Sequence, residues 1–305
     1  MNRSIPNIFA KKICRASGFH GEIRQGEELR RHTSLKIGGP ADIFLIPASP
    51  ADLITLLKSL TEEDIPCFIL GRGSNLLISD RGVRGIVIQV GPGFTKFNFR
   101  DDSLVTEAGV TFSRLAQAAA ERELSGLEFA AGIPGTVGGA VVMNAGCGEG
   151  DISRVVKRVR TFKPGTGIKD WTVDECRFGY RTSRFCQSDE IILEVELKLE
   201  PDLSSVIKER MDKIITRRKK SLPLEYPSAG SIFKNPPGDY AGRLIEAADL
   251  KGRSVGEAQI SEKHANIIVN YGAASFRDVE QLISFAREKV KEKFSIDLEL
   301  EIDIW

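Results

Sequence analysis

The most informative segment reads Gly132-Ile133-Pro134-Gly135-Thr136-Val137-Gly138-Gly139, with four glycines in eight positions. It continues through Ala140 to Met143 into Asn144-Ala145-Gly146. Because glycine has no Cβ, such a segment lets the backbone approach a flat or anionic ligand closely. About sixty residues earlier, Gly71-Arg72-Gly73-Ser74-Asn75 forms a second glycine turn, where successive N–H groups suit phosphate oxygens and two side chains add donors.

Each glycine turn alone is weak evidence, because such turns are more often purely structural. Two of them favour a nucleotide ligand. Neither has the GxGxxG spacing of a Rossmann domain between a strand and a long helix, and the chain has no GKS or GKT P-loop. We therefore expect a nucleotide site of another type.

Length and composition bound the function. The 305 residues predict two or three compact units, and 43 basic against 42 acidic residues give a net charge of +1. This balance predicts no nucleic-acid or membrane-surface binding. With no leader-like start and no apolar stretch of membrane-spanning length, we expect a cytoplasmic protein, and no oligomer is predicted.

Cysteine and histidine spacing predicts no metal site. The five cysteines are odd in number and contain no CxxC pair, so they are expected to be reduced thiols. The three histidines, His20, His32 and His264, lie far apart in the sequence and match no ligand pattern. The cysteines are Cys14, Cys67, Cys147, Cys176 and Cys186.

Patterning predicts an α+β fold with three segments. Residues 1–33 form a helical or irregular extension, residues 34–203 form a domain of two subdomains (34–91 and 92–203), and residues 204–305 form a second domain. Helices are expected after Ser49-Pro50, with Leu53, Leu56, Leu57 and Leu60 on one face, and over 111–122. Strands are expected over 41–47, 67–70, 76–78, 86–90, 104–105, 155–162 and 191–199.

The last domain is expected to contain two helices and a strand. Ser204 would cap a helix with Ile207, Met211, Ile214 and Ile215 facing inward. Ser275 to Asp278 would open a second helix that buries Val279, Leu282, Ile283, Ala286 and Val290. Alternation over 295–305 predicts a strand with Ile296, Leu298, Leu300, Ile302 and Ile304 on one face and four acidic residues on the other.

Five motifs occur in one order along the chain. They are His32-Thr33-Ser34-Leu35-Lys36-Ile37-Gly38-Gly39, Gly71-Arg72-Gly73-Ser74-Asn75-Leu76-Leu77, Gly126-Leu127-Glu128 with the glycine cluster, Gly179-Tyr180-Arg181-Thr182-Ser183-Arg184-Phe185, and Ala229-Gly230-Ser231-Ile232-Phe233-Lys234-Asn235-Pro236. From about His32 to Glu301 the chain resembles the UDP-N-acetylenolpyruvoylglucosamine reductase (MurB) family, in its shorter form. Their combined order is far more specific than any single motif.

The resemblance implies an FAD-binding domain of the vanillyl-alcohol-oxidase (PCMH) type followed by an α+β substrate-binding domain. It implies reduction of an enolpyruvyl UDP-sugar by NADPH through bound FAD, in peptidoglycan precursor synthesis. The FAD contacts implied are Gly71, Arg72, Gly73, Ser74, Asn75, Leu76, Gly132, Ile133, Pro134, Gly135, Val137, Gly138, Gly139 and Gly146.

The resemblance also implies the catalytic residues. Arg181 would bind the substrate carboxylate, Ser231 would donate a proton to carbon, and Glu301 would support the developing enediolate. Without the motifs, the alternative interpretation of Arg181 is a surface or structural ion pair. Ser231 would then be a cap or turn residue, and Glu301 one of four solvated acids. The substrate contacts implied are Tyr180, Lys220, Asn235 and His264, and Lys219 is an alternative to Lys220 at the diphosphate.

Two other functions remain open at this point. One is a flavin oxidase or dehydrogenase with another substrate, because a fold does not determine a function. The other is a nucleotide-binding module without catalysis. One departure from the family is Ile302-Asp303-Ile304-Trp305, where the family commonly has an arginine and then a glycine.

Overall fold

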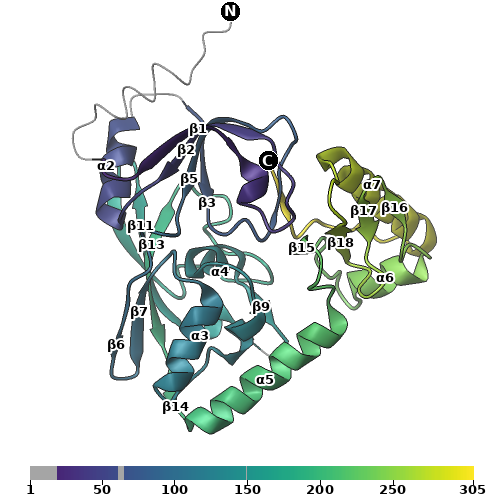
Figure 1. The fold of residues 1–305 in the computed structure, drawn as a ribbon. Coiled ribbons are helices and arrows are strands. Elements are labelled where there is room, and N and C mark those ends of the chain that lie inside the picture. Colours follow the sequence, from purple (N-terminus) through teal and green to yellow (C-terminus); the bar gives the residue numbers. More distant parts are fainter. Residues whose placement is uncertain (1–18, 61–64, 149) are drawn as a thin grey trace, which may run out of the picture. The chain divides into compact units, whose positions relative to one another are not determined.

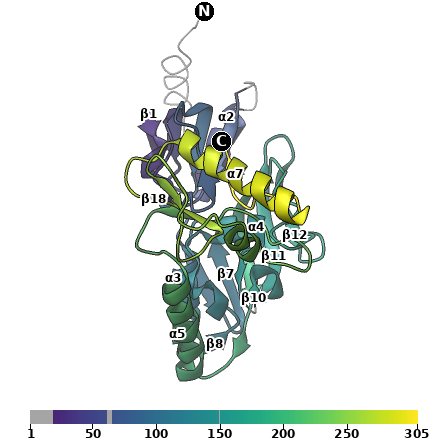
Figure 2. The ribbon, with the colours of Figure 1, turned by 90° about the vertical axis from the view of Figure 1, so that its right-hand side faces the viewer.

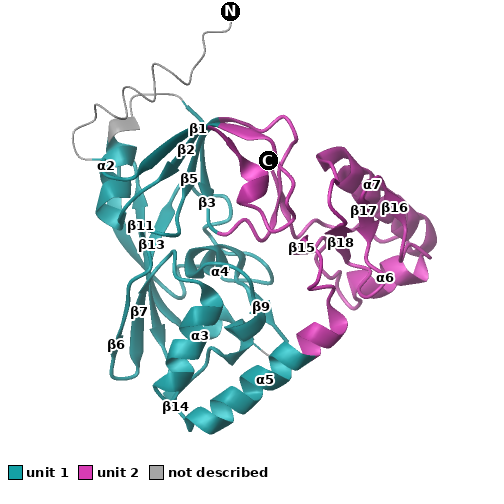
Figure 3. Cartoon of the chain, in the orientation of Figure 1, with its two compact units in different colours: residues 1–25, 42–71, 85–216 teal, residues 26–41, 72–84, 217–305 magenta. Residues whose placement is uncertain are grey.

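The computed structural model describes residues 19–60, 65–148 and 150–305, and the chain packs into two compact units (Figure 3). The first unit comprises the described residues in three ranges: those up to Gln25, those in 42–71, and those in 85–216. The second comprises residues 26–41, 72–84 and 217–305. The units therefore interleave along the sequence, and they divide the chain differently from the predicted domains.

The interleaving has a physical cause in the second unit. Leu35, Ile37 and Leu77 are buried in the same apolar core as residues of 229–302. Asn270 adds a polar tie, because its Nδ2 donates to the Leu35 carbonyl at 3.0 Å. Two early segments of the chain thus complete the core of the C-terminal part.

The first unit is built around an antiparallel sheet of order β12-β11-β13-β7-β6 (Figure 1). Its strands are β6 (Phe97–Arg100), β7 (Ser103–Glu107), β11 (Val156–Lys163), β12 (Gly167–Thr172) and β13 (Ile191–Lys198). Leu193, Val195 and Leu197 are buried while Glu194 and Glu196 are half-buried, which confirms the predicted alternation in β13.

A second sheet has the order β1-β2-β5-β3, in which β3 and β5 run parallel. Its strands are β1 (Glu22–Glu28), β2 (Pro40–Ile46), β3 (Cys67–Leu70) and β5 (Val83–Gln89). The prediction of a helical or irregular start is wrong for β1. This strand lies at the sheet edge, where backbone pairing suffices and no apolar alternation is required. Residues 1–18 lie outside the described residues.

Helices α2 (Pro50–Leu60) and α3 (Phe112–Glu121) confirm the two expected helices of this unit. In α2 the Asp52 N–H donates to Ser49 Oγ at 3.1 Å, and Leu53, Leu56 and Leu57 are buried, whereas the Leu60 side chain is outside the described part. Shorter elements are η1 (Leu29–Arg31), η2 (Glu128–Gly132), η3 (Ile152–Arg154), β8 (Leu124–Ser125), β14 (Glu200–Pro201), β9 (Gly146–Cys147) and β10 (Gly150–Asp151).

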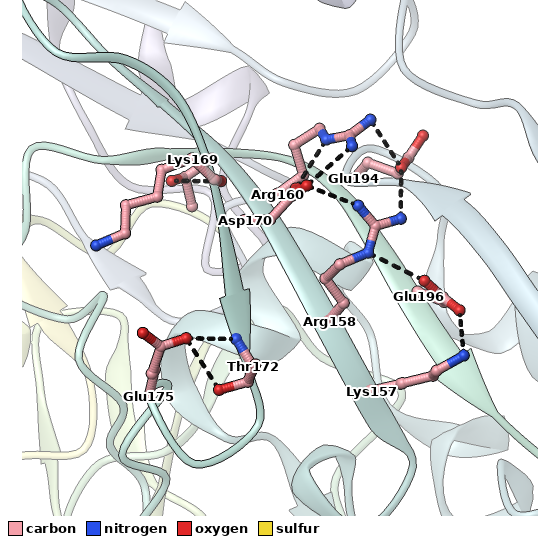
Figure 4. Close-up of polar contacts among 10 residues, drawn as sticks. Lys157, Arg158, Arg160, Lys169, Asp170, Thr172, Glu175, Glu194 and Glu196 are labelled. Atoms are coloured by element: carbon pink, nitrogen blue, oxygen red, sulfur yellow. Dashed lines mark hydrogen bonds and ion pairs between the residues drawn. The ribbon is translucent and has the colours of Figure 1, made fainter.

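An exposed ladder of charges crosses β11, β12 and β13 (Figure 4). Asp170 accepts hydrogen bonds from Arg160 Nε at 2.8 Å and from Arg158 Nη1 at 2.9 Å. These bonds, that from Arg160 above all, hold the pKa of Asp170 below its usual value. Lys157 and Arg158 also bind Glu196, at 2.8 and 3.0 Å. Each such solvent-facing ion pair contributes little to the free energy of unfolding. We therefore assign the ladder a structural role in the sheet.

The second unit contains a sheet of order β15-β18-β17-β16. Its strands are β15 (Ser228–Ser231), β16 (Ser254–Val255), β17 (Ala258–Ile260) and β18 (Ile267–Asn270), with helix α6 (Ala241–Ala247). Helix α7 (Phe276–Phe294), the long yellow helix of Figure 2, packs against β16 and β17. Its capping box of Ser275 and Asp278 and its five buried apolar residues are confirmed as predicted.

Helix α5 (Ser204–Ser221) begins where predicted, but only Ile207 of its four expected inward residues is buried. Met211, Ile214 and Ile215 are half-exposed. The predicted strand over 295–305 is also wrong in extent, because only β19 (Asp303–Ile304) pairs as a strand, with β4 (Leu76–Leu77). Ser295 has φ +59° as the cap of α7, and Ile304 is 40% exposed, so the alternation fails at both ends.

Candidate active site

The end of the larger glycine cluster forms the start of helix α4 (Val137–Met143), which the sequence did not predict. Two of the cluster's glycines, Gly138 and Gly139, lie in this helix and lower its propensity, and bonds to other elements hold the helix instead. Thr136 Oγ1 accepts the Gly139 N–H at 3.3 Å, and the N–H groups of Val137 and Gly138 donate to the carbonyls of Val110 and Ala108 at 2.9 and 2.8 Å. The cluster is thereby fixed on its support.

Gly71 belongs to the same site in the first unit. A Cβ at Gly71 would lie 2.8 Å from Thr136 Oγ1, so the first glycine turn lies against the cap of α4. Pro134 and Gly139 are exposed, and Gly132, Ile133 and Gly135 are partly exposed. Val137 and Gly138 are buried, so their part in any ligand site is to pack the backbone.

Arg181 sits in a tight turn of the first unit. Its φ of +53° is unusual for a residue with a side chain, and backbone bonds between Gly179 and Thr182 at 3.0 and 3.3 Å close the turn. Arg181 Nη2 donates to the Gly146 carbonyl at 3.0 Å. The guanidinium carbon lies 5.4 Å from the ring centre of Tyr180, which is 54% exposed. The structure thus brings together Arg181, Tyr180 and Gly146.

Asn144 and Ser183 were missed by the sequence reasoning. Asn144 ends α4 with φ 45° and ψ 56°, is buried, and donates from Nδ2 to the Gly179 carbonyl at 2.9 Å. Its Oδ1 accepts the Ser153 N–H at 3.2 Å, and Ser183 Oγ donates to the Val142 carbonyl at 2.7 Å. These bonds tie the end of α4 to the Arg181 turn. An asparagine after a short helical run was the available signal.

The rest of the first glycine turn lies in the second unit. Gly73 has φ +60°, and a Cβ there would lie 2.2 Å from the His32 carbonyl oxygen. The Ser34 N–H donates to the Gly73 carbonyl at 3.0 Å, so the first motif supports the turn. Arg72 is exposed, Ser74 and Asn75 are half-buried, and Leu76 is buried.

Glu301 is bonded to the residue next to Ser231 in the second unit. Ser231 ends β15 after Gly230, whose φ is +76°. The Glu301 N–H donates to the carbonyl of Ile232 at 2.8 Å, and Asn75 Nδ2 donates to the Glu301 carbonyl at 2.9 Å. Glu301 is thus bonded to the predicted cofactor residue Asn75 and to Ile232, the residue that follows Ser231.

Asn266 braces the chain next to Ser231 and was also missed. It is buried, its Oδ1 accepts the Phe233 N–H at 3.0 Å, and its Nδ2 donates to the Phe233 carbonyl at 2.8 Å. Its backbone carbonyl accepts the Ile232 N–H at 2.9 Å. No local sequence pattern links residues so far apart.

Three predicted substrate residues lie on separate elements of the second unit. The exposed Asn235 accepts the Ala241 N–H at 3.1 Å on Oδ1, which caps α6. Lys220 is exposed in the last turn of α5. His264 Nδ1 is buried and has no hydrogen-bond partner among the described residues, and burial lowers the pKa of His264. Burial therefore favours the neutral imidazole.

The described residues show neither a disulfide nor a metal cluster. Cys67, Cys147, Cys176 and Cys186 are free thiols, and Cys14 lies outside this part. Within the same ranges, no group of three His, Cys, Asp or Glu side chains could hold a metal ion. No helix there is long and apolar enough to cross a membrane.

Two protein-family profiles match the chain, and their matched ranges include residues of both units. A family profile described as UDP-N-acetylenolpyruvoylglucosamine reductase, C-terminal domain, matches residues 222–305, and one described as FAD binding domain matches residues 41–168. These matches, with the mixed helices and strands, confirm the α+β fold class.

Relatives match along nearly the whole chain. A UDP-N-acetylenolpyruvoylglucosamine reductase of Caldanaerobacter subterraneus subsp. tengcongensis is 45% identical, covering 93% of this chain and 94% of its own. One of Syntrophomonas wolfei is 41% identical, covering 92% and 94%. The crystal structure of the Thermus caldophilus enzyme (MurB) is 36% identical, with a TM-score of 0.79, covering 94% of this chain and 99% of that one.

Proposed function

Because the chain belongs to the UDP-N-acetylenolpyruvoylglucosamine reductase family, we propose that it reduces UDP-N-acetylglucosamine enolpyruvate to UDP-N-acetylmuramate. NADPH is the hydride donor and FAD the bound cofactor, in peptidoglycan precursor synthesis. The observation that carries the proposal is the 45% identity that extends over 93% of the chain. Because it includes the family's C-terminal domain, it favours this reaction over a flavin oxidase with another substrate.

The glycine turns fit FAD. A Cβ at Gly71 would lie 2.8 Å from Thr136 Oγ1, and one at Gly73 would lie 2.2 Å from the His32 carbonyl, so only glycine lets these turns pack as they do. Gly73 has φ +60°, a left-handed conformation of the kind found in backbone turns that bind phosphate oxygens. When bound, FAD supplies two-electron transfer from the nicotinamide to the enolpyruvyl group. The residues proposed to hold it are Gly71, Arg72, Gly73, Ser74, Asn75, Leu76, Gly132, Ile133, Pro134, Gly135, Val137, Gly138, Gly139 and Gly146.

Arg181 is proposed to bind the substrate carboxylate. Its planar guanidinium forms paired, charge-assisted hydrogen bonds with a carboxylate and stabilises the negative charge that grows during reduction. The turn that holds it has a strained φ of +53° and is fixed by Asn144, as expected for a residue whose direction matters.

Ser231 is proposed to donate the proton to carbon, and Glu301 to stabilise the enediolate or manage a proton. A serine hydroxyl is a weak acid, so the accepting carbon must be strongly basic. Two bonds fix the Glu301 backbone and support this proposal: its N–H donates to the Ile232 carbonyl, and its carbonyl accepts from the Asn75 side-chain amide. Proton transfer depends on such positioning.

The remaining substrate contacts are proposed from their chemistry. Tyr180 and Asn235 offer polar groups at exposed positions, and Lys220 offers a cation for the diphosphate. A neutral His264 can exchange a hydrogen bond with the sugar nucleotide, which would satisfy its buried Nδ1.

The domain roles and location are part of the same proposal. Residues 34–203 (subdomains 34–91 and 92–203) bind FAD and residues 204–305 bind the UDP-sugar, while residues 1–33 receive no role. The enzyme works in the cytoplasm, where its small-molecule substrates are made, and contributes through the cell wall to cell shape and division.

Steady-state turnover tests the function. The purified protein should release FAD on denaturation and should consume NADPH only when UDP-N-acetylglucosamine enolpyruvate is present. Mass spectrometry should show a product with two more hydrogen atoms. A folded protein that takes up no FAD would support the nucleotide module, and substrate-independent NADPH consumption with oxygen would support an oxidase.

A further inference from the structure

Asp303–Trp305 pair with the chain directly after the first glycine turn. Strand β19 runs parallel to β4, with Asp303 opposite Leu76 and Ile304 opposite Leu77. The Asp303 N–H donates to the Asn75 carbonyl at 2.9 Å, and the Trp305 N–H donates to the Leu77 carbonyl at 3.0 Å. The Trp305 carbonyl accepts the Ser79 N–H at 2.8 Å. Three backbone bonds therefore hold this segment on residues 75–79.

Asn75 is held from two sides. Its carbonyl accepts from Asp303, and its Nδ2 donates to the Glu301 carbonyl at 2.9 Å. Glu301 is held in turn by its N–H bond to the Ile232 carbonyl at 2.8 Å. A loop proposed to bind FAD and an acid proposed to act on the substrate thus share one support.

The backbone of this segment carries the support. The Asp303 carboxylate accepts only local bonds that are described, from the Ile304 N–H at 3.1 Å and from Trp305 Nε1 at 3.2 Å. Ile304 is 40% exposed. The N–H groups of Asp303 and Trp305 point to β4, whereas that of Ile304 points to the Asp303 carboxylate.

We propose that Asp303 and Trp305 are positioning residues whose backbone N–H groups hold the Arg72–Leu76 loop in its FAD-binding conformation and in register with Glu301. The inference rests on the proposed FAD site. It also gives a role to two of the four residues in which this chain departs from the common family pattern. The strand pairing uses backbone donors, so Asp303-Ile304-Trp305 can form it in place of the common family residues.

FAD affinity with proline variants tests the proposal, because proline removes one N–H. The apoprotein is titrated with FAD, and flavin fluorescence gives Kd. Asp303→Pro should raise Kd by about tenfold, the upper effect of one hydrogen bond. Asp303→Ala keeps the N–H and should bind FAD as the wild type does. Ile304→Pro removes an N–H that does not face β4 and should also leave Kd unchanged.

Trp305→Pro and Trp305→Ala form a second pair, which decides the question if Asp303→Pro does not fold. The proline variant should weaken FAD binding and shift the visible flavin absorbance band, and the alanine variant should do neither. Wild-type Kd in both proline variants, or equal weakening in Ile304→Pro, would overturn the positioning role. A wild-type protein that binds no FAD would overturn the proposed function instead.

Discussion

Asn144→Ala probes the link between the glycine helix and the Arg181 turn. Asn144 is 5% exposed, and its side chain makes hydrogen bonds to the Gly179 carbonyl at 2.9 Å and from the Ser153 N–H at 3.2 Å. Alanine would lose both bonds and would also hold a Cβ in the left-handed conformation.

These terms set the expected loss of stability. Each lost hydrogen bond costs about 0.5–1.5 kcal/mol. A left-handed conformation costs alanine roughly 1 kcal/mol more than glycine. The free energy of unfolding should therefore fall by about 2–4 kcal/mol in Asn144→Ala, and by about 1–3 kcal/mol in Asn144→Gly, which keeps the backbone relaxed.

Urea unfolding followed by tryptophan fluorescence measures this loss. The chain has two tryptophans, and Trp171 is buried in the first unit. In a Trp305→Phe background, Trp171 alone reports the unfolding of that unit. Asn144→Asp is the matched functional control, because it keeps an acceptor for Ser153 but lacks the donor to Gly179.

Asn144→Asp should therefore lower kcat through a loosened Arg181 turn, and its buried carboxylate facing the Gly179 carbonyl should cost at least as much stability as Asn144→Ala. If both Asn144→Ala and Asn144→Gly unfold within 0.5 kcal/mol of the wild type, a difference typical of neutral surface changes, the assigned tie does not hold the turn.

Three further outcomes are expected. Ser231→Ala should keep flavin reduction by NADPH near the wild-type rate. It should slow flavin reoxidation by the enolpyruvyl substrate roughly a hundredfold to ten-thousandfold, because only this half-reaction needs a carbon to be protonated. Equal slowing of both half-reactions in stopped-flow absorbance would exclude Ser231 as the proton donor. Arg181→Lys should retain FAD but lose turnover, because an ammonium cannot replace the planar fork, and wild-type kcat would exclude Arg181. Burial lowers the pKa of His264, so as pH falls below about 6.5 the unfolded chain binds a proton at this residue before the folded chain does, and the free energy of unfolding should decrease. In urea unfolding between about pH 7.5 and about pH 5.5, His264→Gln should flatten this decrease. An unchanged pH dependence in this variant would contradict the assignment.

Helices with strong local signals were predictable. Ser275 and Asp278 form the capping box of α7, and the five apolar residues at helical spacing are all buried. Here capping, spacing and burial agree, so the local pattern determines the element.

Elements held by distant partners were not predictable. Strand β1 is polar and is held by edge pairing. Helix α4 forms despite its two glycines because Val110 and Ala108 accept its first N–H groups. The strand near the end shortens to β19, because its register is set by β4, which precedes it by more than two hundred residues.

The site residues came from motifs, and their geometry came from the structure. Spacing alone could not distinguish Glu301 from its neighbouring acids, whereas the fold joins its backbone to Asn75 and Ile232. Asn144 and Asn266 were missed because each acts on a residue more than thirty positions away, Gly179 and Phe233 respectively.

Anaerobic absorbance of the bound flavin tests the central claim most directly. The purified protein should be yellow, with the oxidised-flavin absorbance band at about 450 nm. This band should disappear when NADPH is added and should return when UDP-N-acetylglucosamine enolpyruvate is added next. UDP-N-acetylglucosamine, which lacks the enolpyruvyl group, should not restore the colour. Flavin that stays bleached with the enolpyruvyl substrate, or recovers equally with both sugars, would contradict the assigned reaction.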